Sequence, residues 1–337
     1  MKQQWIERPE AGGVAALLLI RTFALLCGRT AARLVLIPIT LYYLVRRKPE
    51  RRASRAYLRR ILGRDPSLLE IAKHIHCFAA VILDRVFLLS ERFTRFDVRA
   101  YGIDQIHAAL AQKKGVLIFG THLGSFDALR VLSQFSKTAK TRVVIDTDQS
   151  PATFAVLNRL NPELAASIIN ARQEGTSTAL AIKEALDEQC LVTLLVDRAR
   201  PGNPVLDADF LGSPAPFPTS PWLLAATLKV PVMLCFGLYR GGNRYDLHFE
   251  PFADVLVIER TRRQAALRDT LQRFSGRLEH YARIAPYNWF NFYDFWHLHD
   301  ATRAPDRPVA ANAAGVEAAR DIGDTGAAAD DGAMRRT

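Results

Sequence analysis

The sequence predicts an α/β fold: a largely parallel, mixed sheet flanked by helices and preceded by amino-terminal membrane-associated helices. Two observations support this prediction. From residue 115 onward, short strand-like runs alternate with helix-like segments, which is typical of strand–helix units in a parallel sheet. Ahead of them, an apolar segment is followed directly by a dense basic block. The 337 residues are 49% hydrophobic and 23% charged, which excludes a chain that is disordered throughout.

The net charge of +11 is concentrated in one place. Residues 46–64 hold nine basic residues and one acidic residue, and residues 34–45, just before them, are uncharged. Such a block indicates an anionic partner: a membrane surface, a nucleic acid or a phosphorylated substrate. The neighbouring residues are aliphatic, whereas a nucleic-acid surface would interleave aromatic and polar side chains. We therefore expect an anionic membrane surface as partner and no nucleic acid.

The apolar segment is predicted to lie in the membrane interface. Twelve uncharged residues are fewer than the ~20 that a bilayer span requires. On a helix, Arg21, Arg29 and Arg33 would share one side, from which their side chains could reach lipid headgroups. Pro38 would kink or end that helix. One tilted span over about 14–45 is the alternative. A secretory signal is not expected, because no small-residue cleavage site follows the apolar run.

The elements are expected in the following order. A helix over about 66–93 begins with Ser67 and Glu70, which have the spacing of a capping box. Strands are expected at 115–120, 142–146, 190–196 and 231–239, and helices at 126–135, 153–160, 176–188, 221–229 and 259–284. These elements divide the chain into a membrane-associated helical segment with its basic block (1–65), an α/β domain (66–304) and a disordered tail (305–337).

A candidate site lies where the first strand ends. That strand ends at Gly120 and a helix begins near Ser125, with His122 and Asp127 placed around this turn. On one continuous helix the two side chains would diverge by about 140°, but a turn allows them to meet. We predict that the Asp127 carboxylate accepts a hydrogen bond from one imidazole nitrogen, leaving the other as a general base. From these residues alone, a histidine that merely caps the turn remains the alternative.

The nucleophile is expected to come from the substrate. The sequence has no G-x-S-x-G elbow to supply a serine, and a substrate hydroxyl attacking an activated acyl group needs only a base. Backbone N–H groups near Ser125, at the start of a helix, are expected to stabilise the oxyanion.

Three sequence blocks resemble a known superfamily. The H-x4-D pattern after an apolar strand resembles the lysophospholipid acyltransferases. The blocks at 191–202 and 209–221 resemble the lipid A (lauroyl/myristoyl) acyltransferase-like branch, and 225–231 resembles the helix and strand that follow them there. The resemblance covers about 90–260. It implies a membrane-associated O-acyltransferase that moves an acyl group from a thioester to a hydroxyl of a lipid acceptor: lipid A-like, phospholipid or related.

The resemblance also implies roles for individual residues. His122 corresponds to the general base and Asp127 to the acid that orients it, although many lipid A enzymes have Glu at the latter position. The implied substrate-binding residues are Asp197, Arg198, Phe210, Gly212 and Arg172. Asp197 is an acidic strand-end residue, Arg198 is placed to bind a phosphate or carboxylate, and Arg172 aligns only loosely with a site arginine of the branch.

The resemblance implies acyl carrier protein or coenzyme A thioester as donor co-substrate, with no other cofactor and no metal. It implies a bacterial inner (cytoplasmic) membrane location, at the cytoplasmic face. A thioester hydrolase and a non-catalytic lipid-binding protein of the same fold remain alternatives. The His74/His76 pair and the cluster His297, His299 and Asp300 are interpreted as structural. The aromatic run at 287–296 is expected either to pack over the core or to lie at the membrane interface or beside the acyl chain.

Overall fold

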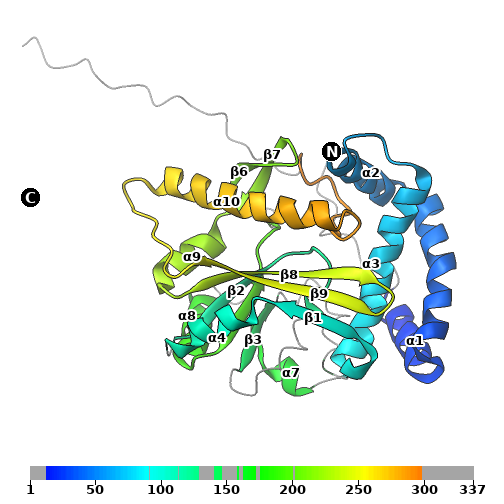
Figure 1. Cartoon of the computed structure of the whole chain (residues 1–337), viewed down its shortest axis with the longest axis horizontal. Helices are drawn as coiled ribbons and strands as arrows, with labels where there is room; N and C mark the ends of the chain where they lie inside the picture. Colours follow the sequence, from blue (N-terminus) through cyan, green and yellow to red (C-terminus); the bar gives the residue numbers. More distant parts are fainter. Residues whose placement is uncertain are drawn as a thin grey trace, which may run out of the picture. The chain divides into compact units, whose positions relative to one another are not determined.

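A computed structural model gives the fold and describes residues 13–90, 92–112, 114–128, 140–145, 158, 162–171, 175–199 and 202–297 (Figure 1). Within these ranges, side chains are described from Thr22 onward, apart from those at 163 and 164. The helix expected at 153–160, apart from Asn158, and the tail expected at 305–337 lie outside the described residues.

A seven-stranded mixed sheet forms the centre of the fold, in the order β1-β9-β8-β2-β5-β3-β4. All neighbouring strands pair in parallel except β8 and β9, which form an antiparallel hairpin. The predicted fold class is therefore confirmed. The strands are β1 (Asp97–Tyr101), β2 (Val116–Gly120), β3 (Thr141–Ile145), β4 (Ile168–Asn170), β5 (Leu191–Leu195), β8 (Val232–Gly241) and β9 (Arg244–Ala253).

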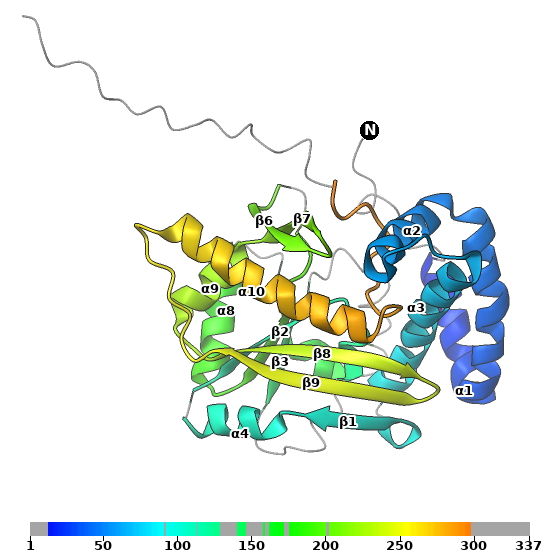
Figure 2. The same cartoon turned by 45° about the horizontal axis from the view of Figure 1, so that its top comes forward.

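Helices bury both faces of the sheet. Along β2, Leu117 and Phe119 join one hydrophobic cluster, and Val116 and Ile118 join the other, as the alternation of a strand dictates. In Figure 2, α10 lies on one side of the sheet and α4 on the other, and α1 stands beside α3 at one end. The helices are α1 (Gly13–Arg46), α2 (Lys48–Leu62), α3 (Leu68–Leu89), α4 (Ile103–Ala111), α7 (Pro162–Ala166), α8 (Gly175–Asp187), α9 (Ser220–Leu228) and α10 (Arg263–Ile284), with a 3₁₀ turn η1 (Phe93–Arg95).

A separate hairpin, β6 (Val205–Phe210) and β7 (Ser213–Pro218), was not among the predicted strands. Taken from the sequence alone, the three prolines of β7 indicate a turn and not a strand. In the structure they occupy alternate positions of the strand, opposite Val205, Asp207 and Asp209. Alternate residues of an edge strand direct their N–H away from the partner, so a proline there costs no hydrogen bond. Leu211 and Gly212 both have positive φ, as a two-residue hairpin turn of type I′ requires.

Helix α1 corrects two expectations. Pro38 does not end it: the helix continues to Arg46, and its non-helical residue is Gly28, with φ 83°. The Arg29 and Arg33 side chains do not extend to a solvent-facing side. Arg29 forms a bidentate ion pair with the buried Asp84 of α3, with Nε–Oδ1 2.7 Å and Nη2–Oδ2 2.8 Å, and Arg33 donates to the Gly242 carbonyl at 2.6 Å. A buried carboxylate requires a cation or donors to compensate its charge, so these contacts tie α1 to α3 and to the β8–β9 turn.

The opposite side of α1 is apolar and exposed. The segment Thr22–Arg46 is long and apolar enough to cross a membrane, by length and composition alone, and only 22% of its apolar window is buried. Leu26 is 80% exposed and Leu34 66%. Arg29 and Arg33 therefore contact the protein, whereas aliphatic side chains such as Leu26 and Leu34 are left uncovered.

Candidate active site

The candidate site lies at the carboxyl ends of two adjacent parallel strands. β2 and β5 pair so that Gly120 is opposite Leu195, and the Val196 amide extends the ladder by donating to the Gly120 carbonyl at 3.0 Å. His122 follows β2 by two residues, and Asp197 follows β5 by two. Because both strands end at the same edge, the two side chains are brought together.

His122 and Asp197 form a hydrogen-bonded pair. The Nδ1–Oδ1 distance is 2.7 Å, and the His122 backbone amide donates to Oδ2 at 3.0 Å. Since an ionised carboxylate only accepts, Nδ1 carries the proton and Nε2 keeps its lone pair. Asp197 is fully buried, and the His122 side chain is 30% exposed. The imidazole is thus oriented from inside the protein and reachable from outside.

The electrostatics favour a neutral base next to an ionised acid. Burial would raise the pKa of Asp197, but the charge of His122, its hydrogen bonds and Arg198 together lower that pKa to about 2. Burial lowers the pKa of His122, the charge of Arg198 lowers it further, and Asp197 only partly opposes them. At neutral pH the imidazole is therefore unprotonated and able to accept a proton.

The prediction that Asp127 accepts a hydrogen bond from the His122 imidazole is wrong. Asp127 accepts from Arg85 of α3 instead, with Nε–Oδ2 2.6 Å. The reason is geometric: His122 lies in the loop beside the end of β5, whereas Asp127 lies in the helical turn that follows and faces α3. Arg85 also helps to lower the pKa of His122, so this ion pair lies within electrostatic range of the imidazole.

The loop after β2 is fixed against two other segments. The Gly124 amide donates to the Asn288 carbonyl at 2.8 Å, and the Ser125 amide donates to the Gly237 carbonyl at 2.7 Å. Gly124 has φ +74°, and a Cβ there would lie 1.9 Å from the Gly237 oxygen, so only glycine fits. The Gly124 and Ser125 amides are thus unavailable as oxyanion donors. The next two amides, of Phe126 and Asp127, have no hydrogen bond to other described residues.

The residues to which the resemblance assigns substrate binding lie in different parts of the structure. Arg198 follows Asp197 directly, donates to the Phe290 carbonyl and lies over the Tyr293 ring at 5.6 Å. Phe210 is fully buried, with its ring 5.0 Å from that of Trp289. Gly212 lies at the β6–β7 turn. Arg172 lies outside the described residues.

The aromatic run was singled out in the sequence, but its contacts with His122 and Asp197 were not predicted. The Trp289 indole donates to Asp197 Oδ2 at 3.2 Å, and the Phe290 amide donates to the His122 carbonyl at 3.0 Å. Trp289, Phe290, Phe295 and Trp296 are all buried, so this part of the aromatic run packs over the core. The run was visible in the sequence, but nothing in its pattern connects it to His122. Arg85 was missed for the same reason.

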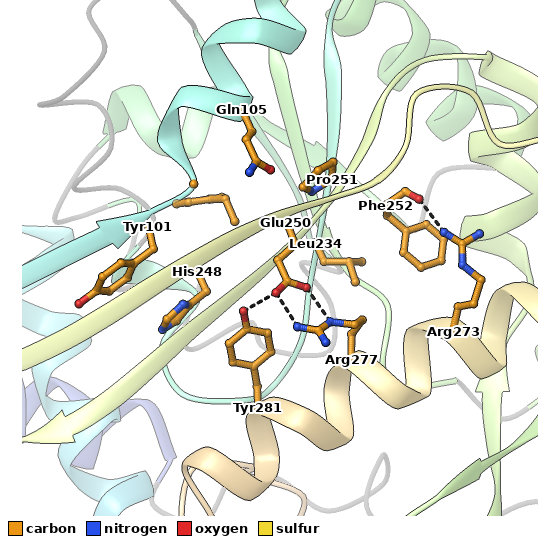
Figure 3. Close-up of a pocket in the computed structure, with 12 residues that line it drawn as sticks. Tyr101, Gln105, Leu234, His248, Glu250, Pro251, Phe252, Arg273, Arg277 and Tyr281 are labelled. Carbon is orange, nitrogen blue, oxygen red and sulfur yellow. Dashed lines mark hydrogen bonds and ion pairs between the residues drawn. The ribbon is translucent and has the colours of Figure 1, made fainter.

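An open pocket of about 630 Å³ lies elsewhere, lined by residues of β1, α4, β8, β9 and α10 (Figure 3). Its Glu250 carboxylate is paired with Arg277 at 2.6 Å and accepts from the Tyr281 hydroxyl at 2.6 Å. Neither His122 nor Asp197 lines it. Within the described part of the chain, no three His, Cys, Asp or Glu residues are grouped so as to hold a metal ion.

Comparison with known proteins adds a family to this geometry. The model of a family described as bacterial lipid A biosynthesis acyltransferase matches residues 25–297. The matched range holds His122, Asp197, Arg198 and the Trp289 segment. A comparison with curated proteins gives no match.

Proposed function

The chain belongs to the bacterial lipid A biosynthesis acyltransferase family, and from that premise we propose that it is a membrane-associated O-acyltransferase. The proposed reaction moves an acyl group from acyl carrier protein or coenzyme A thioester to a hydroxyl of a lipid A-like, phospholipid or related acceptor. The observation that carries it is the neutral His122 imidazole, oriented through Nδ1 by the buried Asp197. No further cofactor is proposed.

The chemistry follows from that pair. His122 Nε2 takes the proton of the acceptor hydroxyl as its oxygen attacks the thioester carbonyl carbon. The tetrahedral intermediate collapses, the C–S bond breaks, and the departing thiolate takes the proton back from the imidazolium. The products are an ester and a free thiol. Asp197 stabilises the imidazolium, and the Phe126 and Asp127 amides, with Arg85 near them, are the proposed donors to the oxyanion.

The substrate-binding roles of Arg198, Arg172, Phe210 and Gly212 remain predictions. For Arg198, the buried Nε lacks a hydrogen-bond partner among the described residues, which leaves a donor for an anionic group if the side chain moves. For Phe210, the proposed contribution is indirect, through the Trp289 ring that it contacts.

The function is tested by following the acyl group. The full-length protein, in detergent–lipid micelles, receives acyl-labelled carrier-protein thioester or acyl-coenzyme A in separate reactions, each with a hydroxyl-bearing lipid acceptor. We expect the label in an acceptor ester, one per thiol released, with the better donor shown by the faster reaction. Free acid as sole product would make the protein a hydrolase. No thioester consumption, with lipid still bound, would make it a non-catalytic binding protein.

The membrane contact is proposed to involve α1 and α2 together, at the cytoplasmic face of the inner membrane. α1 contributes the exposed aliphatic side chains Leu26, Leu34, Ile37, Leu41 and Val45. α2 buries Ala53, Ser54, Tyr57, Leu58 and Ile61, and directs Arg52, Arg55 and Arg59 to solvent. An apolar helix beside a basic amphipathic one fits a bilayer with anionic headgroups.

Charge reversal on α2 tests this contact. We expect Arg52→Glu with Arg55→Glu to weaken binding to anionic vesicles by at least about thirtyfold, because each basic residue near such a surface contributes ~1 kcal/mol and the new carboxylates are repelled. The measurement is vesicle flotation at two salt concentrations. Arg263→Glu with Arg268→Glu, exposed on α10, is the control of equal charge change. Equal loss in both double variants, or equal binding to zwitterionic vesicles, would contradict a specific role for α2.

A further inference from the structure

We propose that Trp289 is a positioning residue for the His122–Asp197 pair, and that His74 and Ser54 hold Trp289 in place. This inference rests on the proposed acyltransferase function. It concerns a buried series of hydrogen bonds that runs from α2 through α3 to the site, none of it assigned by the family match.

Trp289 supplies a donor that Asp197 requires. Asp197 is fully buried and ionised, and its Oδ2 accepts from the His122 amide at 3.0 Å and from the Trp289 indole at 3.2 Å. A buried carboxylate needs such donors, because each missing one leaves charge that water no longer solvates. Only Oδ1 is then left for the His122 Nδ1–H, which sets the direction of the imidazole.

The indole is held by packing on several sides. Its ring centroid lies 5.1 Å from Tyr57, 5.0 Å from Phe210 and 4.9 Å from Phe295, and Trp289 is fully buried. Its backbone also bridges Leu123, and the next residue donates to the His122 carbonyl. Trp289 therefore contacts the loop of the base through its backbone and the orienting acid through its side chain.

His74 fixes the Trp289 backbone from the other side. Its Nε2 lies 2.9 Å from the Trp289 carbonyl, and its Nδ1 lies 2.8 Å from the Ser54 hydroxyl. Burial lowers the pKa of His74 to about 4, so the ring is neutral at neutral pH. Since a carbonyl only accepts, Nε2 carries the proton and Nδ1 accepts from Ser54. Both ring nitrogens are thus used, and α2 is tied to the segment that orients Asp197.

Removing the indole donor should change the acidity of His122 in a defined direction. With one donor fewer, the Asp197 carboxylate attracts the imidazolium more strongly, so the pKa of His122 rises. The other charged groups that act on His122 are Arg198 and Arg85, and Trp289→Phe leaves the charge of both unchanged. A merely structural role for Trp289 would lower the amount of folded protein without moving this pKa.

The experiment compares two tryptophans. Trp289→Phe keeps the ring and removes the N–H. Trp222→Phe is the matched control, because Trp222 is equally buried in the same core and its Nε1 has no partner among the described residues. We expect Trp289→Phe to lower kcat about tenfold, leave KM for the thioester within about twofold, and shift the acid limb of kcat/KM to higher pH. Trp222→Phe should leave the limb in place.

His74 variants extend the same test. His74→Phe should lower kcat in the same way as Trp289→Phe, and His74→Gln should recover much of the loss, since its amide can again donate to the Trp289 carbonyl. If wild type and Trp222→Phe are active but Trp289→Phe matches them in kcat and pH profile, the positioning role is refuted. If wild type and His122→Ala show the same thioester turnover, the proposed function itself fails, so the two failures are distinguished.

Discussion

Replacing His122 with alanine should lower kcat/KM for acyl transfer by about three orders of magnitude while the protein stays folded. General-base catalysis by a positioned imidazole contributes up to ~10⁴-fold. Folding should survive, because the His122 side chain is 30% exposed and Asp197 keeps the His122 amide and the Trp289 indole as donors. Thioester turnover, thermal melting and far-UV circular dichroism together check this expectation.

His107→Ala serves as its control, because His107 is an exposed histidine on α4, away from the site. In the wild type, the base is active when neutral, so activity should hold above the pKa of His122 and fall as pH drops through it. Since that pKa is lowered, the acid limb should lie below pH ~6.5. Normal transfer by a folded His122→Ala protein would refute the mechanism, as would an acid limb that persists in it.

The central strands β2, β5 and β8 could be predicted because they are buried on both faces, whereas β1, β4 and β9 were not among the expected strands. β2, β5 and β8 are largely apolar runs in the sequence. Each of their observed ends lies within two residues of the predicted end. β7 was not predicted, because its prolines indicate a turn unless the partner strand β6 is known. Whether β7 can pair depends on which side of the strand is left without a partner, and the local sequence pattern does not indicate that side.

The site could be predicted only in part, for a related reason. A strand end followed by His122 is a local feature, as is a strand end followed by Asp197, and both were singled out. Which carboxylate meets the imidazole depends on strand order, since β5 lies next to β2 only in the folded sheet. Asp127 is closer in sequence but belongs to a turn that faces α3. Sequence distance therefore pointed to the wrong partner.

The arginines of α1 show the same limit. Their spacing correctly places Arg29 and Arg33 on one side of a helix, but spacing does not say what that side faces. The structure places the buried Asp84 of α3 there, held also by the Tyr245 hydroxyl at 2.8 Å. The carboxylate of Asp84 within the mostly apolar stretch 77–89 of α3 was the available signal, because a buried acid requires a cation or several donors.

The two aspartates give the second large prediction: Asp197→Asn should lower kcat about a thousandfold, and Asp127→Asn no more than about tenfold. An amide at position 197 can donate to Nδ1, which moves the imidazole proton to Nε2 and removes the base. It also removes the negative charge that raises the pKa of His122, so the acid limb should move to lower pH. Asp127→Asn leaves the imidazole partner intact and loses only the ion pair with Arg85.

The pair of variants decides between the two arrangements directly, since both replace one aspartate by its closest neutral analogue. Steady-state kinetics across pH 5–9 gives kcat and the acid limb for each, and thermal melting shows whether either is unfolded. Asp197→Glu should retain more activity than Asp197→Asn if the charge is what matters. A large loss in Asp127→Asn, with the acid limb moved and Asp197→Asn nearly normal, would reverse the assignment and make Asp127 the orienting acid.

Arg85→Gln then completes the comparison. If Arg85 stabilises the oxyanion, its loss should lower kcat more than Asp127→Asn does, because the cation and not its partner acts on the reacting carbonyl.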